Sequence, residues 1–375
     1  MEWKTVKLGE VITIKYGKDH KALGAGSIPV YGSGGIMRYA DKAICDKPSI
    51  LIPRKGSLNN IFYVNKPFWT VDTMFWSIID TEKADPHFLF YAICKLDFAG
   101  LNVGSAVPSL TVPVIEAVEL ALPPLETQRR IAAILSSLDD KIENNNRINR
   151  NLEEQAQALF KSWFVDFEPW GGIMPEDWKE GTLGDIIAEI ESGSRPKGGA
   201  QTSGVPSIGA EKIERFGIYD FSGEKYVSEE FFNKMKRGHV NDGDVMLYKD
   251  GAYTGKCSMA LDGFPYKECA VNEHVFLLRT EEAKYQFYLY LNMIQESVRS
   301  MIYTLACSKA AQPGLNTSEV LGVKTIIPTE AVMMDFNSKV ANMMHTIANN
   351  CLESHRLATI RDTLLPKLMR GEISL

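Results

Sequence analysis

Two loops hold the side chains best suited to binding a polar or anionic partner. They span residues 54–63 and 249–256, each follows a short apolar run, and each holds a glycine at a comparable place, Gly56 or Gly251. Lys, Arg, Asn and Ser on a loop can reach phosphates and the edges of nucleic-acid bases. A solvated hairpin explains either loop equally well, so both interpretations stay open. The candidate contact residues are Arg54, Lys55, Ser57, Asn59, Asn60 and Tyr63 in the first loop, and Lys249, Tyr253, Thr254 and Lys256 in the second.

A second pair of loops lies further along the chain, at residues 104–109 and 307–312. Ser105 in the first of these loops, and Lys309 and Gln312 in the second, are further candidates for contacts to such a partner. The alternative is a plain linker to the strand that follows.

The sequence holds little that could carry out catalysis. It has no Walker A loop, no Gly-x-Gly-x-x-Gly after a strand, no Gly-x-Ser-x-Gly elbow and no Asn-Pro-Pro-Tyr-like methylation motif. The Gly32–Gly35 run lacks the helix of a phosphate-binding loop and is interpreted as a turn. The six histidines have no metal-ligand spacing, and Asp72 and Glu273 fall at loosely corresponding places without a catalytic partner. A standalone nuclease or methyltransferase is therefore disfavoured, and no metal or cofactor is expected on this chain.

Length and composition are those of a multidomain globular protein. The chain has 375 residues, of which 45% are hydrophobic and 23% charged, which suits two or three domains. No run of eighteen apolar residues and no apolar signal-peptide core is present, so we expect a cytoplasmic protein. The six cysteines form no Cys-x-x-Cys pair, which favours reduced thiols over disulfides or a zinc site.

Charge is uneven along the chain. The net charge is −6 overall, about +1 over residues 1–123, −2 over 124–170, −5 over 171–328 and 0 over 329–375. This balance is a mild argument against a classical basic DNA-binding protein. Any contact with nucleic acid must then use local clusters, or basic partners must supply the remaining charge.

The chain repeats itself. The start of each copy matches at a constant offset of 175, and the end matches at an offset of 205, so the second copy holds 30 extra residues. The matched positions are Trp3, Leu8, Gly9, Glu10, Val11 and Ile12 against Trp178, Leu183, Gly184, Asp185, Ile186 and Ile187, and Pro108, Leu110 and Pro123 against Pro313, Leu315 and Pro328.

Each copy combines a globular part with a long helix. Short apolar runs between Gly and Pro residues predict strands, and helical patches between them indicate an α+β domain. After Pro123-Pro124, apolar residues recur at steps of four and three from about Thr127 to Val165, as in a coiled coil. We predict a globular domain at 1–123, a helical spacer at 124–170, a second globular domain at 171–328 and a second helix at 329–375.

The polar layers of the two helices predict how they pair. In an antiparallel register whose facing residues sum to 499, Asn149 meets Asn350 and Asn145 meets Ser354, flanked by Ile142 and Leu357. A buried Asn pair costs stability but fixes register. Leu138 would face Arg361, which we expect to extend into solvent. The alternative is an ordinary amphipathic helix packed on its own domain. The paired arrangement predicts two similar heads at opposite ends of a helical rod about 58 Å long.

Three motifs resemble the specificity subunit of type I restriction-modification systems, and the resemblance covers the whole chain. Pro123-Pro-Leu-Glu-Thr-Gln128-Arg-Arg-Ile131 is similar to the start of that family's central helix. Residues 159–169 resemble the exit into its second target-recognition domain, and residues 364–373 resemble its C-terminal end. The second copy departs from the pattern, since Pro328-Thr-Glu-Ala lacks the Glu-x-Gln and its helix need not bind partners identically.

The resemblance implies a DNA-reading subunit without catalysis of its own. Each globular domain would read one half of a bipartite, asymmetric double-stranded site, and the helices would set the spacing. The helices would also dock two modification subunits, which use S-adenosylmethionine to methylate adenine, and restriction subunits can join them. The alternative is a duplicated scaffold that binds proteins through its helices without reading DNA. Co-purification with a methyltransferase separates these two hypotheses.

Overall fold

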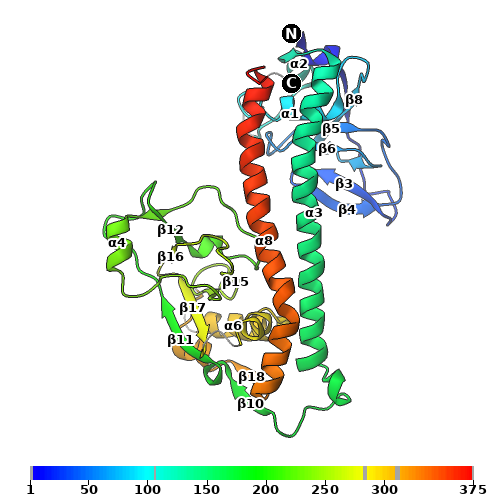
Figure 1. Ribbon diagram of the computed structural model, residues 1–375. Coiled ribbons are helices and arrows are strands. Elements are labelled where there is room, and N and C mark those ends of the chain that lie inside the picture. Colours follow the sequence, from blue (N-terminus) through cyan, green and yellow to red (C-terminus); the bar gives the residue numbers. More distant parts are fainter. Residues whose placement is uncertain (1–2, 105–106, 282–284, 309–312, 374–375) are drawn as a thin grey trace. The chain divides into compact units, whose positions relative to one another are not determined.

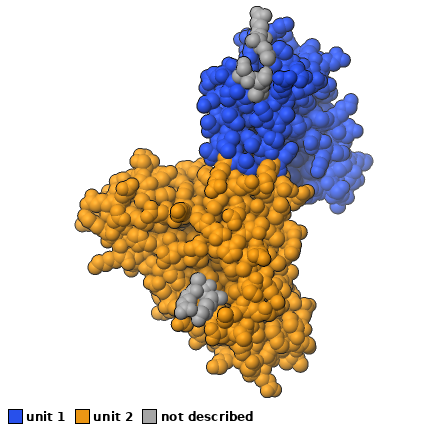
Figure 2. All heavy atoms as spheres, in the orientation of Figure 1, with its two compact units in different colours: residues 1–140, 357–375 blue, residues 141–356 orange. Residues whose placement is uncertain are grey.

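The chain is divided between two compact units, each with strands and helices. The structure is a computed structural model that describes residues 3–104, 107–281, 285–308 and 313–373. Unit 1 holds residues 1–140 and 357–375, and unit 2 holds residues 141–356 (Figure 2). We call residues 3–122 the first head and residues 179–327 the second head.

The first head is built from three small sheets and two short helices. Its core strands are apolar, and β5 is buried along its whole length. Helix α1 begins with a proline and is capped by Asp85, whose carboxylate accepts from the amides of His87 and Phe88. The elements are β1 (Lys4–Lys7), η1 (Leu8–Glu10), β2 (Ile12–Tyr16), β3 (Ile28–Gly32), β4 (Gly35–Ala40), β5 (Ser49–Pro53), β6 (Phe62–Val64), β7 (Trp69–Thr70), β8 (Met74–Ile79), α1 (Pro86–Ile93), α2 (Val112–Glu116) and β9 (Glu119–Leu122).

The second head has the same kinds of element in the same order, with additions. The additions include α4 and α6, which have no helical counterpart among the described residues of the first head. The elements are β10 (Lys179–Thr182), η3 (Leu183–Asp185), β11 (Ile187–Ser192), β12 (Val205–Ile208), η4 (Ala210–Lys212), β13 (Tyr226–Val227), α4 (Glu229–Lys234), β14 (Val245–Tyr248), β15 (Cys257–Met259), β16 (Ala270–Val271), β17 (Val275–Thr280), α5 (Gln286–Met293), α6 (Glu296–Cys307), α7 (Thr317–Leu321) and β18 (Lys324–Ile327).

Sheet topology is the same in the two heads. An antiparallel sheet of order β2-β8-β5-β6 corresponds to β11-β17-β14-β15. A three-stranded sheet, β4-β3-β7, corresponds to β13-β12-β16, and in each the middle strand pairs antiparallel on one side and parallel on the other. The first and last strands of each head pair antiparallel, β1 with β9 in the first head and β10 with β18 in the second. The internal duplication predicted from the sequence is therefore visible as a repeated topology.

The extra residues of the second copy are concentrated at one place. Sixteen residues separate β3 from β5, whereas 36 separate β12 from β14. In the first head, only Ser33 and Gly34 separate β3 from β4, which form a tight hairpin. In the second head, β12 is followed by a long excursion, residues 209–225, before β13 begins.

Two 40-residue helices follow the heads, α3 (Leu125–Phe164) and α8 (Glu330–Met369), and Figure 1 draws each as a continuous helix. The range predicted for the first helix agrees with α3 to within two residues. Near the end of α3, Phe160 and Phe164 are buried, one position beyond Leu159 and Trp163, which the steps of four and three predict. Tyr288 and Phe336 of unit 2 pack against these two rings.

Candidate nucleic-acid interface

The same backbone frame supports the predicted loop in each head. In each case the loop leaves the end of a buried strand, β5 or β14, and is held by the segment that precedes α2 or α7. This frame brings together stretches more than 40 residues apart in the sequence. The shared hydrogen bonds are Gly56 N to Pro108 O (3.1 Å) and Leu110 N to Arg54 O (2.9 Å) in the first head, and Gly251 N to Pro313 O (3.0 Å) and Leu315 N to Lys249 O (3.0 Å) in the second.

Both loops turn at a glycine whose conformation excludes most other residues. Gly56 has φ +90° and Gly251 has φ +132°. A Cβ on Gly251 would also lie 2.7 Å from the Tyr248 hydroxyl oxygen. The two glycines therefore mark equivalent sharp turns, which present the residues around them at one end of each four-stranded sheet.

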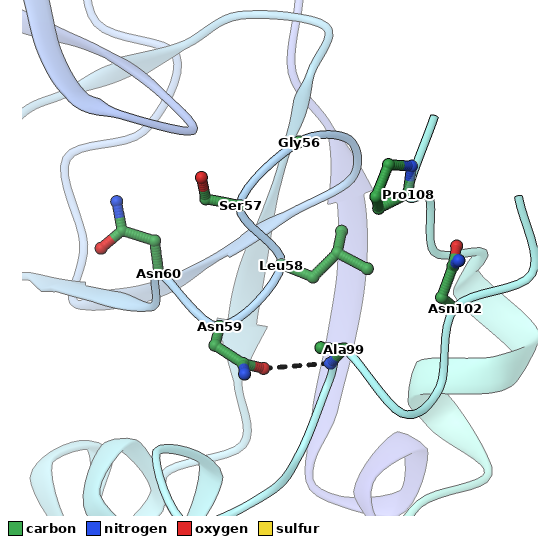
Figure 3. A pocket seen from close by; sticks show the side chains of 8 residues that line it. All are labelled: Gly56, Ser57, Leu58, Asn59, Asn60, Ala99, Asn102 and Pro108. Carbon is green, nitrogen blue, oxygen red and sulfur yellow. Dashed lines mark hydrogen bonds between the residues drawn. The ribbon is translucent and has the colours of Figure 1, made fainter. Parts of the chain in front are cut away.

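The first loop encloses a pocket of about 530 Å³ with residues 99, 102 and 108 (Figure 3). Asn59 anchors the loop, since its Oδ1 accepts from Ala99 N at 3.0 Å. Asn60 donates to the Ser33 carbonyl at 2.7 Å. Lys55 and Ser57 are exposed. These two side chains are free to contact a partner, while the two asparagines also hold the loop in shape.

Arg54 and Tyr63 have different surroundings. The Arg54 guanidinium lies 5.4 Å from the Tyr16 ring centroid and donates to the Asp72 carbonyl at 3.3 Å. These contacts hold Arg54 at the end of the sheet from which the loop leaves. Tyr63 is half-buried on β6 against His87 and Phe90, with ring centroids 4.2 and 5.9 Å away. Burial raises the pKa of its phenol.

In the second loop, Tyr253 is the most exposed candidate, at 60%. Lys256 lies over the Tyr253 ring at 4.3 Å and is paired with Glu214 at 2.5 Å. Thr254 is buried and donates to the Gly251 carbonyl at 2.8 Å, so its hydroxyl shapes the turn. Lys249 donates to the Glu273 carbonyl at 3.3 Å.

Helix α6 adds a wall to the second loop that the sequence analysis did not include. A pocket of about 450 Å³ lies between residues 252–256 and α6, whose Arg299 and Tyr303 line it. Tyr303 is half exposed. The predicted contacts at Ser105, Lys309 and Gln312 lie outside the described residues.

The first head has a further element beside its loop that sequence reasoning missed. The β3–β4 turn contributes Ser33 and Gly34 to a pocket of about 630 Å³, which is also lined by residues 19–21 and 71–73. A Cβ on Gly34 would meet nothing within 4 Å, so this turn is open. The Gly32–Gly35 run was correctly interpreted as a turn, but only the three-dimensional pairing shows that the turn adjoins the loop.

The polar residues of the predicted helix register come together in unit 2. Asn350 donates to Asn149 Oδ1 at 2.8 Å, and Asn145 donates to Ser354 Oγ at 3.3 Å. Asn145 also donates to Glu353 at 2.8 Å. Helices α3 and α8 are therefore antiparallel in this unit. Ile142 and Leu357 are both half-buried.

The expectation for Arg361 was wrong. Arg361 does not extend freely into solvent, because Asp139 accepts its Nη1–H at 2.5 Å within unit 1. The Tyr91 hydroxyl donates to the other Asp139 oxygen at 2.5 Å. At the positions 205 residues away from this pair, Ala156 and Met344 are buried. Unit 1 thus uses a polar contact where unit 2 uses apolar packing.

Neither a metal-binding cluster nor a membrane-spanning helix is present in the part of the chain that the structure describes. No three His, Cys, Asp or Glu side chains there could hold a metal ion. No helix among these residues is both long and apolar enough to cross a membrane.

Comparison with known proteins agrees with this architecture. Residues 1–154 match the type I restriction modification DNA specificity domain. The type I restriction enzyme MjaIX specificity subunit of Methanocaldococcus jannaschii is 26% identical, over 92% of this chain and 83% of its own length. The HindI specificity subunit of Haemophilus influenzae is 27% identical, over 71% of each chain. A type I S subunit from M. genitalium has the same fold, with a TM-score of 0.66 and 18% identity over 98% of this chain and 96% of the other.

A duplicated α+β head, with a long helix after each copy, is the architecture of this chain. In sequence it is similar to the specificity subunits of type I restriction-modification systems, and one solved S subunit has the same fold. Its relatives are named specificity subunits rather than methyltransferases or endonucleases, which agrees with the prediction of a non-catalytic chain.

Proposed function

We propose that each head reads one half of a bipartite, asymmetric double-stranded DNA site. The observation that carries this proposal is the pair of equivalent loops. They share a backbone frame and a turning glycine, yet present Arg54, Lys55 and Ser57 in one head and Lys249, Tyr253 and Lys256 in the other. Equivalent positions with different side chains suit two different half-sites, because base identity is read by side-chain hydrogen bonds in the grooves.

The second part of the proposed function, spacing and docking, belongs to the helices. Paired α3 and α8 set the spacing between half-sites and dock two modification subunits, with which restriction subunits can assemble. The Asn149–Asn350 hydrogen bond supports a fixed register of the helices, since a buried Asn pair disfavours other alignments. S-adenosylmethionine is expected in the modification subunit, and the chain would act where the DNA is, in the cytoplasm.

The test is the adenine methylome of the native host with and without this chain, determined by single-molecule sequencing. Loss of one split, asymmetric motif on deletion supports the proposal and reveals both half-sites. An unchanged methylome contradicts it when the modification subunit is shown to be expressed and to co-purify with this chain. Co-purification without any change in methylation would favour a protein-binding scaffold.

A further inference from the structure

Basic residues are strongly concentrated in one part of the first head. Residues 13–66 hold nine Lys and Arg and only three Asp, although acidic residues outnumber basic ones in the whole chain, 47 to 41. The corresponding part of the second head, residues 188–256, holds ten Lys and Arg against eleven Asp and Glu. Two heads with one topology thus differ in charge at the same place.

None of these nine basic residues forms an ion pair with a carboxylate in the part of the chain that the structure describes. The ion pairs of unit 1 use other cations, Lys83, Arg130, Arg361 and Arg370. Of the nine, Lys18, Lys21 and Lys55 are exposed. These three belong to or lie near the loop at residues 54–63, which we propose to contact DNA. Their charges are therefore not cancelled by a carboxylate within ion-pair distance.

Chain connectivity places these three lysines at one end of the sheet. Strands β2 and β5 both pair antiparallel with β8 and therefore run in the same direction. Their C-terminal ends lie at the same end of the sheet. Lys18 and Lys21 follow β2, and Lys55 follows β5. The Lys21 segment and the β3–β4 turn line one pocket, and Asn60 of the loop bonds to Ser33 in that turn.

The equivalent end of the second head is neutralised by its own carboxylates. Arg195, which follows β11, lies 3.5 Å from Glu273. Lys256 is paired with Glu214, a residue of the excursion that replaces the hairpin. Asp250 of the loop contacts His274 at 2.5 Å. Two cations of this end, the exposed Lys197 and the half-buried Lys249, have no ion pair with a carboxylate among the described residues.

We propose that the two heads contribute unequally to DNA binding, with the first head supplying most of the phosphate contacts through Lys18, Lys21 and Lys55. This inference rests on the proposed function. Each phosphate that a cation neutralises releases counterions and adds about 0.9 to the slope of log K against log salt concentration. Cations already paired with carboxylates contribute less, because the partner cancels their field. The second head then depends on hydrogen bonds to its half-site.

The experiment uses the complex of this chain with its modification subunits and a duplex carrying the methylated motif. Two matched triple variants are compared, Lys18→Gln/Lys21→Gln/Lys55→Gln in the first head and Arg195→Gln/Lys197→Gln/Lys256→Gln in the second. Affinity is measured from low to physiological salt. We expect the first variant to reduce the salt slope by about 2 to 3 and the second by about 1 or less.

Equal reductions of the slope, or a larger one from the second head, would overturn the inference. Such a result leaves the proposed function intact if the unmodified complex still prefers its motif to a scrambled duplex. Absence of that preference would instead contradict the proposed function itself. Thermal unfolding of each variant complex checks that a reduced salt slope does not result from a loss of folded protein.

A gain-of-function variant gives a second readout. Glu273→Gln removes the carboxylate beside Arg195 and His274. We expect it to steepen the salt slope by up to about 1, because the freed guanidinium can then neutralise a phosphate. An unchanged or shallower slope would mean that the paired cations do not face the duplex, which contradicts the assigned reason for the inequality.

Discussion

The β3–β4 hairpin of the first head and the excursion at residues 209–225 of the second occupy the same place in one topology, yet they have opposite surroundings. The hairpin turn is open and its Met37 is 59% exposed. The excursion buries Phe216 to 3% and packs on both long helices of unit 2. Its Arg215 pairs with Glu153 of α3 at 3.3 Å, and Cys351 of α8 donates its thiol to the Gly217 carbonyl.

This difference shows how a duplicated fold can diverge without changing its sheets. The extra residues between two strands of the second head form a packed element in place of an exposed turn, and they include Glu214, which pairs with Lys256. The first head keeps an open, basic surface, while the second gains an anchor to its helices. Divergence in the connections, with conserved strand pairing, is expected because connections run over the surface and tolerate insertion.

The largest expected effect comes from removing the buried aromatic ring of Phe216 in the excursion. Phe216→Ala removes a buried ring that packs against Phe264 and Tyr290, so we expect a loss of about 3–5 kcal/mol in the free energy of unfolding. The matched change in the hairpin, Met37→Ala, should cost less than about 0.5 kcal/mol. Urea unfolding measures both. Similar costs would show that the two connections are not packed differently.

The two loops should differ in which half-site they affect. Arg54→Ala should weaken binding to the first head's half-site by about 1–3 kcal/mol, and Lys249→Ala should act only on the other half-site. Competition among duplexes mutated in one half or the other measures this selectivity. Equal weakening of both half-sites by either variant contradicts modular reading.

The polar contact of unit 1 is expected to be sensitive to removal of one partner. Arg361→Ala leaves Asp139 with the Tyr91 hydroxyl alone, at a cost of about 1–2 kcal/mol. The double variant Asp139→Met/Arg361→Ala copies the residues of unit 2 and should recover most of this loss. A double variant as unstable as the single one would mean that the apolar pair depends on its own surroundings in unit 2.

The smallest effect concerns pH. Burial raises the pKa of Glu153 above its ordinary 4.5, despite Arg215 nearby. The folded chain then holds this proton more tightly than the unfolded chain, so stability falls as pH rises from 4.5 through the folded pKa. Glu153→Gln should flatten this part of the stability curve. An unchanged pH profile in chemical unfolding would show that Glu153 titrates normally.

Periodic and repeated features could be predicted from the sequence. The steps of four and three predicted α3 to within two residues, and the two polar layers identified Asn149 and Asn350, which the structure brings together. These predictions succeed because helical seams are local and regular. The α+β class and the duplication followed from matched residues at both ends of each copy.

Non-local packing could not be predicted in the same way. No spacing rule shows that Asn60 meets Ser33, or that Thr254 is buried while its neighbour Tyr253 remains exposed. Asp139 was not considered as a partner for Arg361, because it lies one position beside the predicted seam. Which residues of a Gly-rich loop face a ligand depends on contacts between distant segments, and only the assembled fold fixes those contacts.

In the proposed function each head reads its own half-site, and the most direct test changes one loop inside the living system. A host whose chain carries Arg54→Ala and Ser57→Ala is analysed by single-molecule methylome sequencing beside the unmodified host. We expect one half of the methylated motif to become degenerate while the other half and the spacing stay the same. Relaxation of both halves, or a motif unchanged in every base, would contradict it.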